Sequence, residues 1–173
     1  MNDNDNDNDN QTNPILASLK MDKLSTKNFK AVTNILLADD DTDDCLLFKE
    51  ALKSLNISTE LTVMYNGEQV MDHLHKSAEL PDILFLDLNM PRKNGFACLD
   101  EIKSDERLKS IPVITFSTSF EQSVVSLLYK NGAQYYIRKP NEFDKLKELI
   151  LRALTLSSEN RNTLTPDQDF VLK

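Results

Sequence analysis

Between residues 33 and 156 the sequence alternates five times between a short strand-like run and a longer amphipathic segment. The continuous apolar runs Ile35–Ala38 and Ile83–Leu86 are typical of parallel strands buried on both faces. The longer segments carry apolar side chains at helical spacing, as an amphipathic helix does. Strands that alternate with helices indicate right-handed βαβ crossovers and a parallel sheet. We therefore predict an α/β fold with five strands (34–38, 60–64, 82–86, 113–116 and 135–138) and five helices (42–55, 68–76, 96–104, 121–130 and 142–154).

Both ends of the chain differ from this central part. Residues 2–10 alternate Asn and Asp without an apolar side chain, and such a segment cannot offset the entropy of ordering itself. We expect residues 1–32 to be a disordered or weakly helical N-terminal tail. After Leu156 the chain is polar again, and we expect 157–173 to be a frayed C-terminal tail, although Phe170-Val171-Leu172 is apolar and could dock. The predicted domain is 33–156.

The composition excludes some classes of partner. The net charge is −8, and an acidic domain gives nucleic acid or an anionic membrane no favourable field. No stretch approaches the ~20 apolar residues of a membrane span, and the N-terminus is too polar for a signal peptide. We expect a cytoplasmic protein without nucleic-acid or membrane partners, in which Cys45 and Cys98 are free thiols.

Charged residues follow three of the predicted strands. Asp39 and Asp40 come after the first strand, Asp87 after the third and Lys139 after the fifth. In an open α/β sheet, ligands bind beyond the carboxyl ends of the strands, so these groups should meet in one crevice. Two carboxylates about 4 Å apart repel by roughly 4 kcal/mol at an effective dielectric of about 20, which favours a cation between them. Oxygen ligands of this kind suit Mg²⁺, and a carboxylate beside it could act as a nucleophile and form an acyl phosphate.

Two further groups fit a phosphoryl site. Ser117 follows the fourth strand, where its hydroxyl could donate to a phosphoryl oxygen, and the ammonium of Lys139 is a strong phosphate ligand. Each group alone is weak evidence, because an acidic run after a strand often only caps a helix, as Asp41 and Thr42 could do here. Two Asp positions, a Ser and a Lys in this order at four strand ends are far more specific.

Four stretches (Ile35–Asp41, Pro81–Gly95, Ile111–Ser119 and Gly132–Pro140) together resemble the receiver domain of a two-component response regulator. The whole is similar to the stand-alone chemotaxis regulator. This resemblance implies a flavodoxin-like doubly wound (βα)5 fold with strand order 2-1-3-4-5. The Ile-Pro-Val and Ser-Thr-Ser patterns also resemble stand-alone regulators that partner bacterial phytochrome kinases.

The resemblance assigns the metal and the acceptor. It implies that Asp87 is the phosphoacceptor and one ligand of Mg²⁺. Asp40 would bind the ion directly, Asp39 mostly through water, and Asn89 through its backbone carbonyl.

The resemblance also assigns the remaining groups. Ser117 would occupy the Thr/Ser switch position and Tyr136 the aromatic switch position. Lys139 would bind the phosphoryl group, and the Lys139–Pro140 peptide bond is expected to be cis.

The resemblance thus implies a single-domain signalling switch, not an enzyme. A sensor histidine kinase or a histidine phosphotransfer protein would donate the phosphoryl group, and a downstream protein would read the result. The switch would be a monomer or a phosphorylation-dependent dimer.

Two alternatives remain open. An aspartyl-phosphate hydrolase typically carries a second Asp two residues after the nucleophile, where this chain has Asn89. A degenerate receiver that only binds partners is disfavoured because all five site groups are present.

Overall fold

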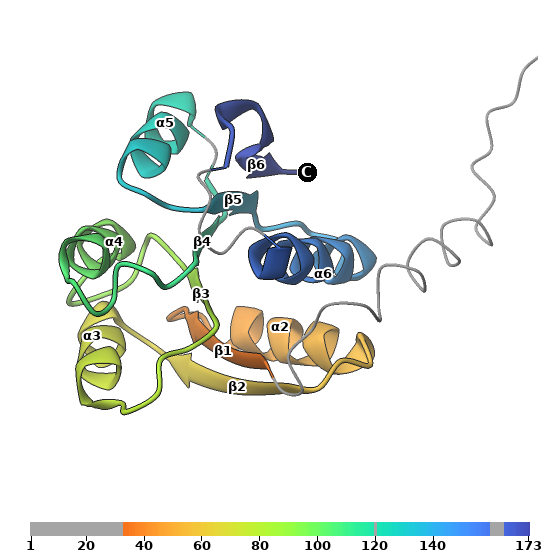
Figure 1. The fold of residues 1–173 in the computed structure, drawn as a ribbon. Helices are drawn as coiled ribbons and strands as arrows, with labels where there is room; N and C mark the ends of the chain where they lie inside the picture. The colour runs from red at the N-terminus through yellow and green to blue at the C-terminus, as the bar shows by residue number, and fades with distance from the viewer. Residues whose placement is uncertain (1–32, 120, 160–164) are drawn as a thin grey trace, which may run out of the picture.

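A computed structural model describes residues 33–119, 121–159 and 165–173. It shows a parallel six-stranded sheet in the order β2-β1-β3-β4-β5-β6, with helices on both faces (Figure 1). The predicted α/β class and the 2-1-3-4-5 order are confirmed, and a short sixth strand is added to them. The predicted N-terminal tail, 1–32, lies outside the described residues.

The elements follow the predicted alternation closely. The strands are β1 (Thr33–Ala38), β2 (Thr59–Met64), β3 (Ile83–Leu86), β4 (Val113–Ser117), β5 (Tyr135–Arg138) and β6 (Val171–Leu172). The helices are α2 (Thr42–Ser54), α3 (Gly67–Lys76), α4 (Gly95–Ser104), α5 (Gln122–Lys130), α6 (Phe143–Glu159) and the short 3-10 helix η1 (Asp167–Asp169). Helix α6 continues to Glu159, beyond the end predicted at 154, because its buried face continues with Leu156, which packs on the core, and with the buried Ser157.

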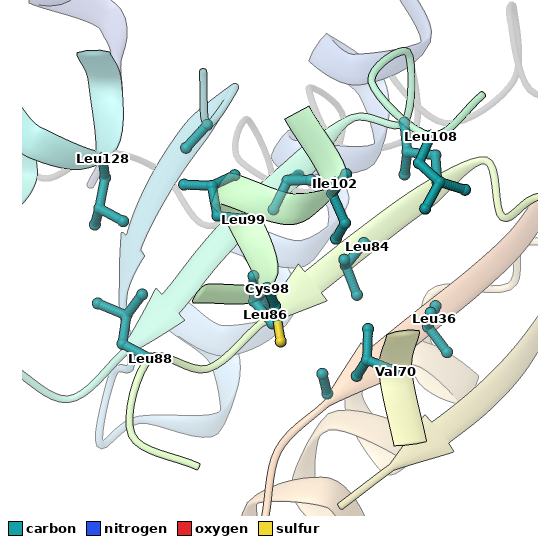
Figure 2. Packing of buried hydrophobic residues seen from close by; sticks show 14 of the residues in the cluster. Leu36, Val70, Leu84, Leu86, Leu88, Cys98, Leu99, Ile102, Leu108 and Leu128 are labelled. Carbon is teal, nitrogen blue, oxygen red and sulfur yellow. The ribbon is translucent and has the colours of Figure 1, made fainter. Parts of the chain in front are cut away.

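Helices α3, α4 and α5 cover one face of the sheet, and α2 and α6 cover the other (Figure 1). Every residue of β3 and β4 is buried, as expected of central strands covered on both sides. Leucines of β1 and β3 point into the first core and meet α3 and α4, as Figure 2 shows for Leu36, Leu84 and Leu86 beside Val70 and Leu99.

Three phenylalanines centre the second core. Phe48 of α2 lies edge-on to Phe85 of β3 and Phe116 of β4, with ring centroids 4.9 and 5.9 Å away. Such edge-to-face pairs add to the stabilisation that comes from burying the rings. The two cores fix the positions of β1, β3 and β4 relative to one another, and those strands end at the candidate site.

The C-terminal segment is not frayed between residues 165 and 173. Phe170 is fully buried and its ring lies edge-on to that of Tyr129, with centroids 5.2 Å apart. Strand β6 pairs with β5, and the backbone N–H of Tyr136 donates to the carbonyl of Phe170 at 2.9 Å. The predicted frayed tail is therefore wrong for this segment, because the edge of β5 offers unpaired backbone groups that a following apolar triplet can satisfy.

Two smaller expectations concern the thiols and the membrane. Cys45 and Cys98 are free and buried, as predicted, and burial raises the pKa of each thiol to about 11. Among the described residues, no helix is both long and apolar enough to cross a membrane.

Replacing Phe170 by Ala should lower the free energy of unfolding by about 3–5 kcal/mol, because a fully buried ring leaves a cavity. Phe143→Ala is the matched control, since that ring is 41% exposed and its loss should cost far less. Urea denaturation of both variants measures the difference. Equal losses would contradict the packing of the C-terminal segment against the domain.

Candidate functional site

The carboxyl ends of β1 and β3 bring three carboxylates together. The two strands pair in register, with Ala38 opposite Leu86, and the N–H of Asp87 donates to the carbonyl of Ala38 at 2.8 Å. One carboxylate oxygen from each of Asp39, Asp40 and Asp87 lies within 4.8 Å of the others. Asp39 and Asp87 are buried and Asp40 is exposed, so the cluster opens to solvent on one side.

The loop after β3 holds Asp87 in place. The backbone N–H of Asn89 donates to Oδ2 of Asp87 at 2.7 Å, and the N–H of Gly95 donates to the carbonyl of Leu88 at 3.0 Å. A Cβ at position 95 would lie 2.2 Å from the backbone oxygen of Asp87. Only glycine therefore lets α4 begin this close to the loop.

Lys139 reaches the cluster from the end of β5. Its Nζ lies 2.7 Å from Oδ2 of Asp39, 2.8 Å from Oδ2 of Asp44 and 3.3 Å from Oδ1 of Asp87. The N–H of Lys139 donates to the carbonyl of Ser117 at 2.9 Å, which fixes where the side chain starts. Ion pairs of the Lys139 ammonium with Asp39 and Asp87 thus link the end of β5 to the ends of β1 and β3.

Burial and charge oppose each other in this cluster. Burial disfavours the charged form of Lys139, but hydrogen bonds to Asp39 and Asp44 outweigh it and raise the pKa of the ammonium. Burial also raises the pKa of Asp39 to about 6, against the lowering effect of its hydrogen bond to Lys139. Lys139 therefore only partly offsets the free-energy cost of burying the charged form of Asp39, and a second cation would offset it further.

The donor set fits a divalent metal ion. Three carboxylates supply hard oxygen ligands, and the exposed Asp40 leaves room for the waters that Mg²⁺ keeps. Asn89 lies on the same loop, and its carbonyl as a further ligand stays a prediction. The residues predicted for the metal from the strand ends are thus close in space.

Ser117 and Tyr136 lie on neighbouring strands beside the cluster. Ser117 is fully buried, and its Oγ has no hydrogen-bond partner in the described part of the chain. Tyr136 is also fully buried, and its hydroxyl donates to the backbone carbonyl of Ser119. Burial raises the pKa of the Tyr136 phenol. The switch roles predicted for both residues stay predictions, but a buried hydroxyl without an acceptor suits a group that bonds only after a change at the site.

One expectation at the site is wrong. None of the described peptide bonds is cis, so the bond between Lys139 and Pro140 is trans. The trans form is the more stable one even before proline, by roughly 0.5–1 kcal/mol. In this form Lys139 still reaches Asp39 and Asp87.

Asp44 is the site residue that the sequence did not single out. It lies in the first turn of α2, whose N-cap is Asp41, as the sequence suggested; Oδ1 of Asp41 accepts from the N–H groups of Asp43 and Asp44. Acidic residues are common in the first turn of any helix because they complement its dipole. The sequence therefore has no signal that separates Asp44 from its neighbour Asp43.

The comparison with known families agrees with this site. The response regulator receiver domain family matches residues 35–151 of the chain. The chain belongs to this family of signalling proteins, whose partners are histidine kinases.

Individual relatives are similar over most of the chain. Response regulator Rcp1 of Synechocystis sp. is 33% identical over 67% of this chain and 82% of its own length. The phosphorylated cyanobacterial phytochrome response regulator RcpA superposes with a TM-score of 0.68 and 32% identity, over 79% of this chain and all of that one. The Mn²⁺-bound form of Rcp1 gives a TM-score of 0.64 and 30% identity, over 77% of this chain and 97% of that one.

Replacing Asp40 by Asn should weaken Mg²⁺ binding by about ten-fold or more, because the carboxylate predicted to bind the ion directly loses its charge. The metal-free variant should also melt at a higher temperature than the wild type, since one of three clustered carboxylates is removed. Asp43→Asn removes the same charge outside the cluster and serves as the control. Calorimetric titration and thermal melting measure both effects, and unchanged affinity would remove Asp40 from the ligand set.

Proposed function

We propose that this protein accepts a phosphoryl group onto Asp87 from a phosphohistidine and thereby switches a protein-interaction surface. The observation that carries the proposal is the position of Asp87. Its buried carboxylate has an oxygen within 4.8 Å of the metal-suited oxygens of Asp39 and Asp40, and its Oδ1 lies 3.3 Å from the ammonium of Lys139. A nucleophile flanked by a metal site and a fixed cation is what phosphoryl transfer requires of a protein.

In the proposed reaction, an oxygen of Asp87 forms a bond to phosphorus as the P–N bond of the donor breaks. The imidazole nitrogen of the donor leaves with the electron pair. Bound Mg²⁺ would neutralise charge on the carboxylates and on the incoming phosphoryl oxygens. Lys139, held against Asp39 at 2.7 Å, donates hydrogen bonds to a phosphoryl oxygen.

The proposed switch follows from the buried hydroxyl beside the site. Ser117 Oγ gains its acceptor when a phosphoryl oxygen arrives at Asp87. Tyr136 then exchanges its bond to Ser119 for another position, and the surface around β5 changes with it. Such a response is a shift between two states of the domain.

The alternatives account for fewer observations. A hydrolase needs a proton carrier two residues after the nucleophile, and Asn89 cannot carry one. A binding-only module would not need a buried ammonium held by three carboxylates.

The partners are part of the proposal. A sensor histidine kinase or a histidine phosphotransfer protein would act as donor in the cytoplasm, and a downstream protein would read the switched surface. The similarity to RcpA favours a kinase of the phytochrome type. We also propose that the protein is a monomer or dimerises on phosphorylation.

Incubation with acetyl phosphate and Mg²⁺ should add one phosphoryl group, seen by intact mass. Asp87→Asn should abolish the adduct, because the amide is a poor nucleophile, while circular dichroism stays that of a folded protein. Asp100→Asn, an exposed change on α4, should leave the adduct unchanged. A persistent adduct supports the switch, and rapid turnover supports the hydrolase. If neither an adduct nor turnover is seen, the binding-only module is supported.

The Tyr136 ring signal in an NMR spectrum of ring-labelled tyrosines should shift on phosphorylation, while the signal of the exposed Tyr65 should not. In Ser117→Ala the Tyr136 shift should be much smaller although Asp87 is still phosphorylated. The lost hydrogen bond to a charged group is worth ~1.5–3 kcal/mol, enough to move a two-state equilibrium roughly ten-fold or more. Identical shifts in both proteins would leave Ser117 as a phosphate ligand only.

A further inference from the structure

Asp44 contacts the ammonium of the site, yet the proposed phosphoryl transfer does not use it. Its Oδ2 lies 2.8 Å from Lys139 Nζ, as close as the buried Asp39 at 2.7 Å. Asp87, the proposed acceptor, is the most distant of the three carboxylates at 3.3 Å. In the unphosphorylated protein Lys139 is therefore held mainly by its two other partners.

The ammonium of Lys139 donates hydrogen bonds to Asp39 and Asp44, while Asp87 lies 3.3 Å away as an ion pair without a hydrogen bond. If Lys139 moves toward a phosphoryl oxygen on Asp87, its hydrogen bond to Asp39 or to Asp44 must lengthen. The side chain of Asp44 is 33% exposed, whereas those of Asp39 and Asp87 are 2% and 7% exposed. Water can replace the lysine at Asp44 at the lowest cost. The ion pair between Lys139 and Asp44 is therefore the contact that breaks.

We propose that Asp44 is a positioning residue that holds Lys139 away from Asp87 and so restrains phosphorylation. The inference rests on the proposed function. As an oxygen of Asp87 bonds to phosphorus and the donor's leaving group departs with the electron pair, Lys139 exchanges Asp44 for a phosphoryl oxygen. The Asp41 cap, which binds the N–H of Asp44 at 3.2 Å, fixes the helix turn that presents the restraint.

A simpler role would give the opposite result. If Asp44 only anchored Lys139 in its working position, its loss would slow phosphorylation. If it only added negative charge, any neighbouring acid would act alike. Asp43 is that neighbour: it lies in the same helical turn and is exposed, and no ion pair with Lys139 is found for it among the described residues.

The test compares phosphorylation rates of the full chain with acetyl phosphate at saturating Mg²⁺, followed by intact mass. Asp44→Asn should react about two- to five-fold faster than Asp43→Asn, the range expected for one partly exposed ion pair. Asp44→Glu keeps a carboxylate within reach and should stay close to the wild type. In a Lys139→Gln background, Asp44→Asn should have no more effect than Asp43→Asn, because the restrained group is gone.

An Asp44→Asn protein that reacts no faster than Asp43→Asn would overturn the inference while wild-type phosphorylation upholds the proposed function. An equal acceleration in the Lys139→Gln background would overturn it too, since the effect would not pass through the ammonium. A wild type that gains no phosphoryl group would overturn both. Thermal melting of each variant confirms that folded protein is being compared.

Discussion

The ammonium of Lys139 among the buried carboxylates is the interaction on which the site depends. In the described part of the chain it is the cation found in an ion pair with both Asp39 and Asp87, two buried carboxylates. Removing one partner from such a buried arrangement leaves an uncompensated charge and is strongly destabilising. The same ammonium is the group that a phosphoryl oxygen needs, so the contact that stabilises the resting site is also the one that the proposed reaction must rearrange.

The parallel sheet makes this contact possible. Paired parallel strands end at the same edge, so residues far apart in the chain meet there: Asp39 follows β1, Asp87 follows β3 and Lys139 follows β5. The aromatic core on one face and the leucine core on the other fix the positions of those strand ends relative to one another. Gly95 then lets the helix after β3 approach the backbone of Asp87.

The C-terminal segment adds a constraint on the proposed switch. The N–H of Tyr136 is bonded to Phe170, and its ring belongs to the same buried cluster. The docked segment therefore contacts the backbone of the residue that the switch is proposed to move.

The sequence by itself determined the α/β class, the strand and helix ranges within about five residues, and the acidic cluster of Asp39, Asp40 and Asp87. Buried parallel strands have continuous apolar sequences, and the charged residues that follow three of the five predicted strands mark the candidate site. Only the tertiary structure decided that Asp44 reaches Lys139, that Phe170 and β6 cover the edge of β5, and that the bond before Pro140 is trans. An acid in a helical first turn or an apolar triplet in a tail is locally ordinary. Its partner is chosen by distances between segments that the local pattern does not encode.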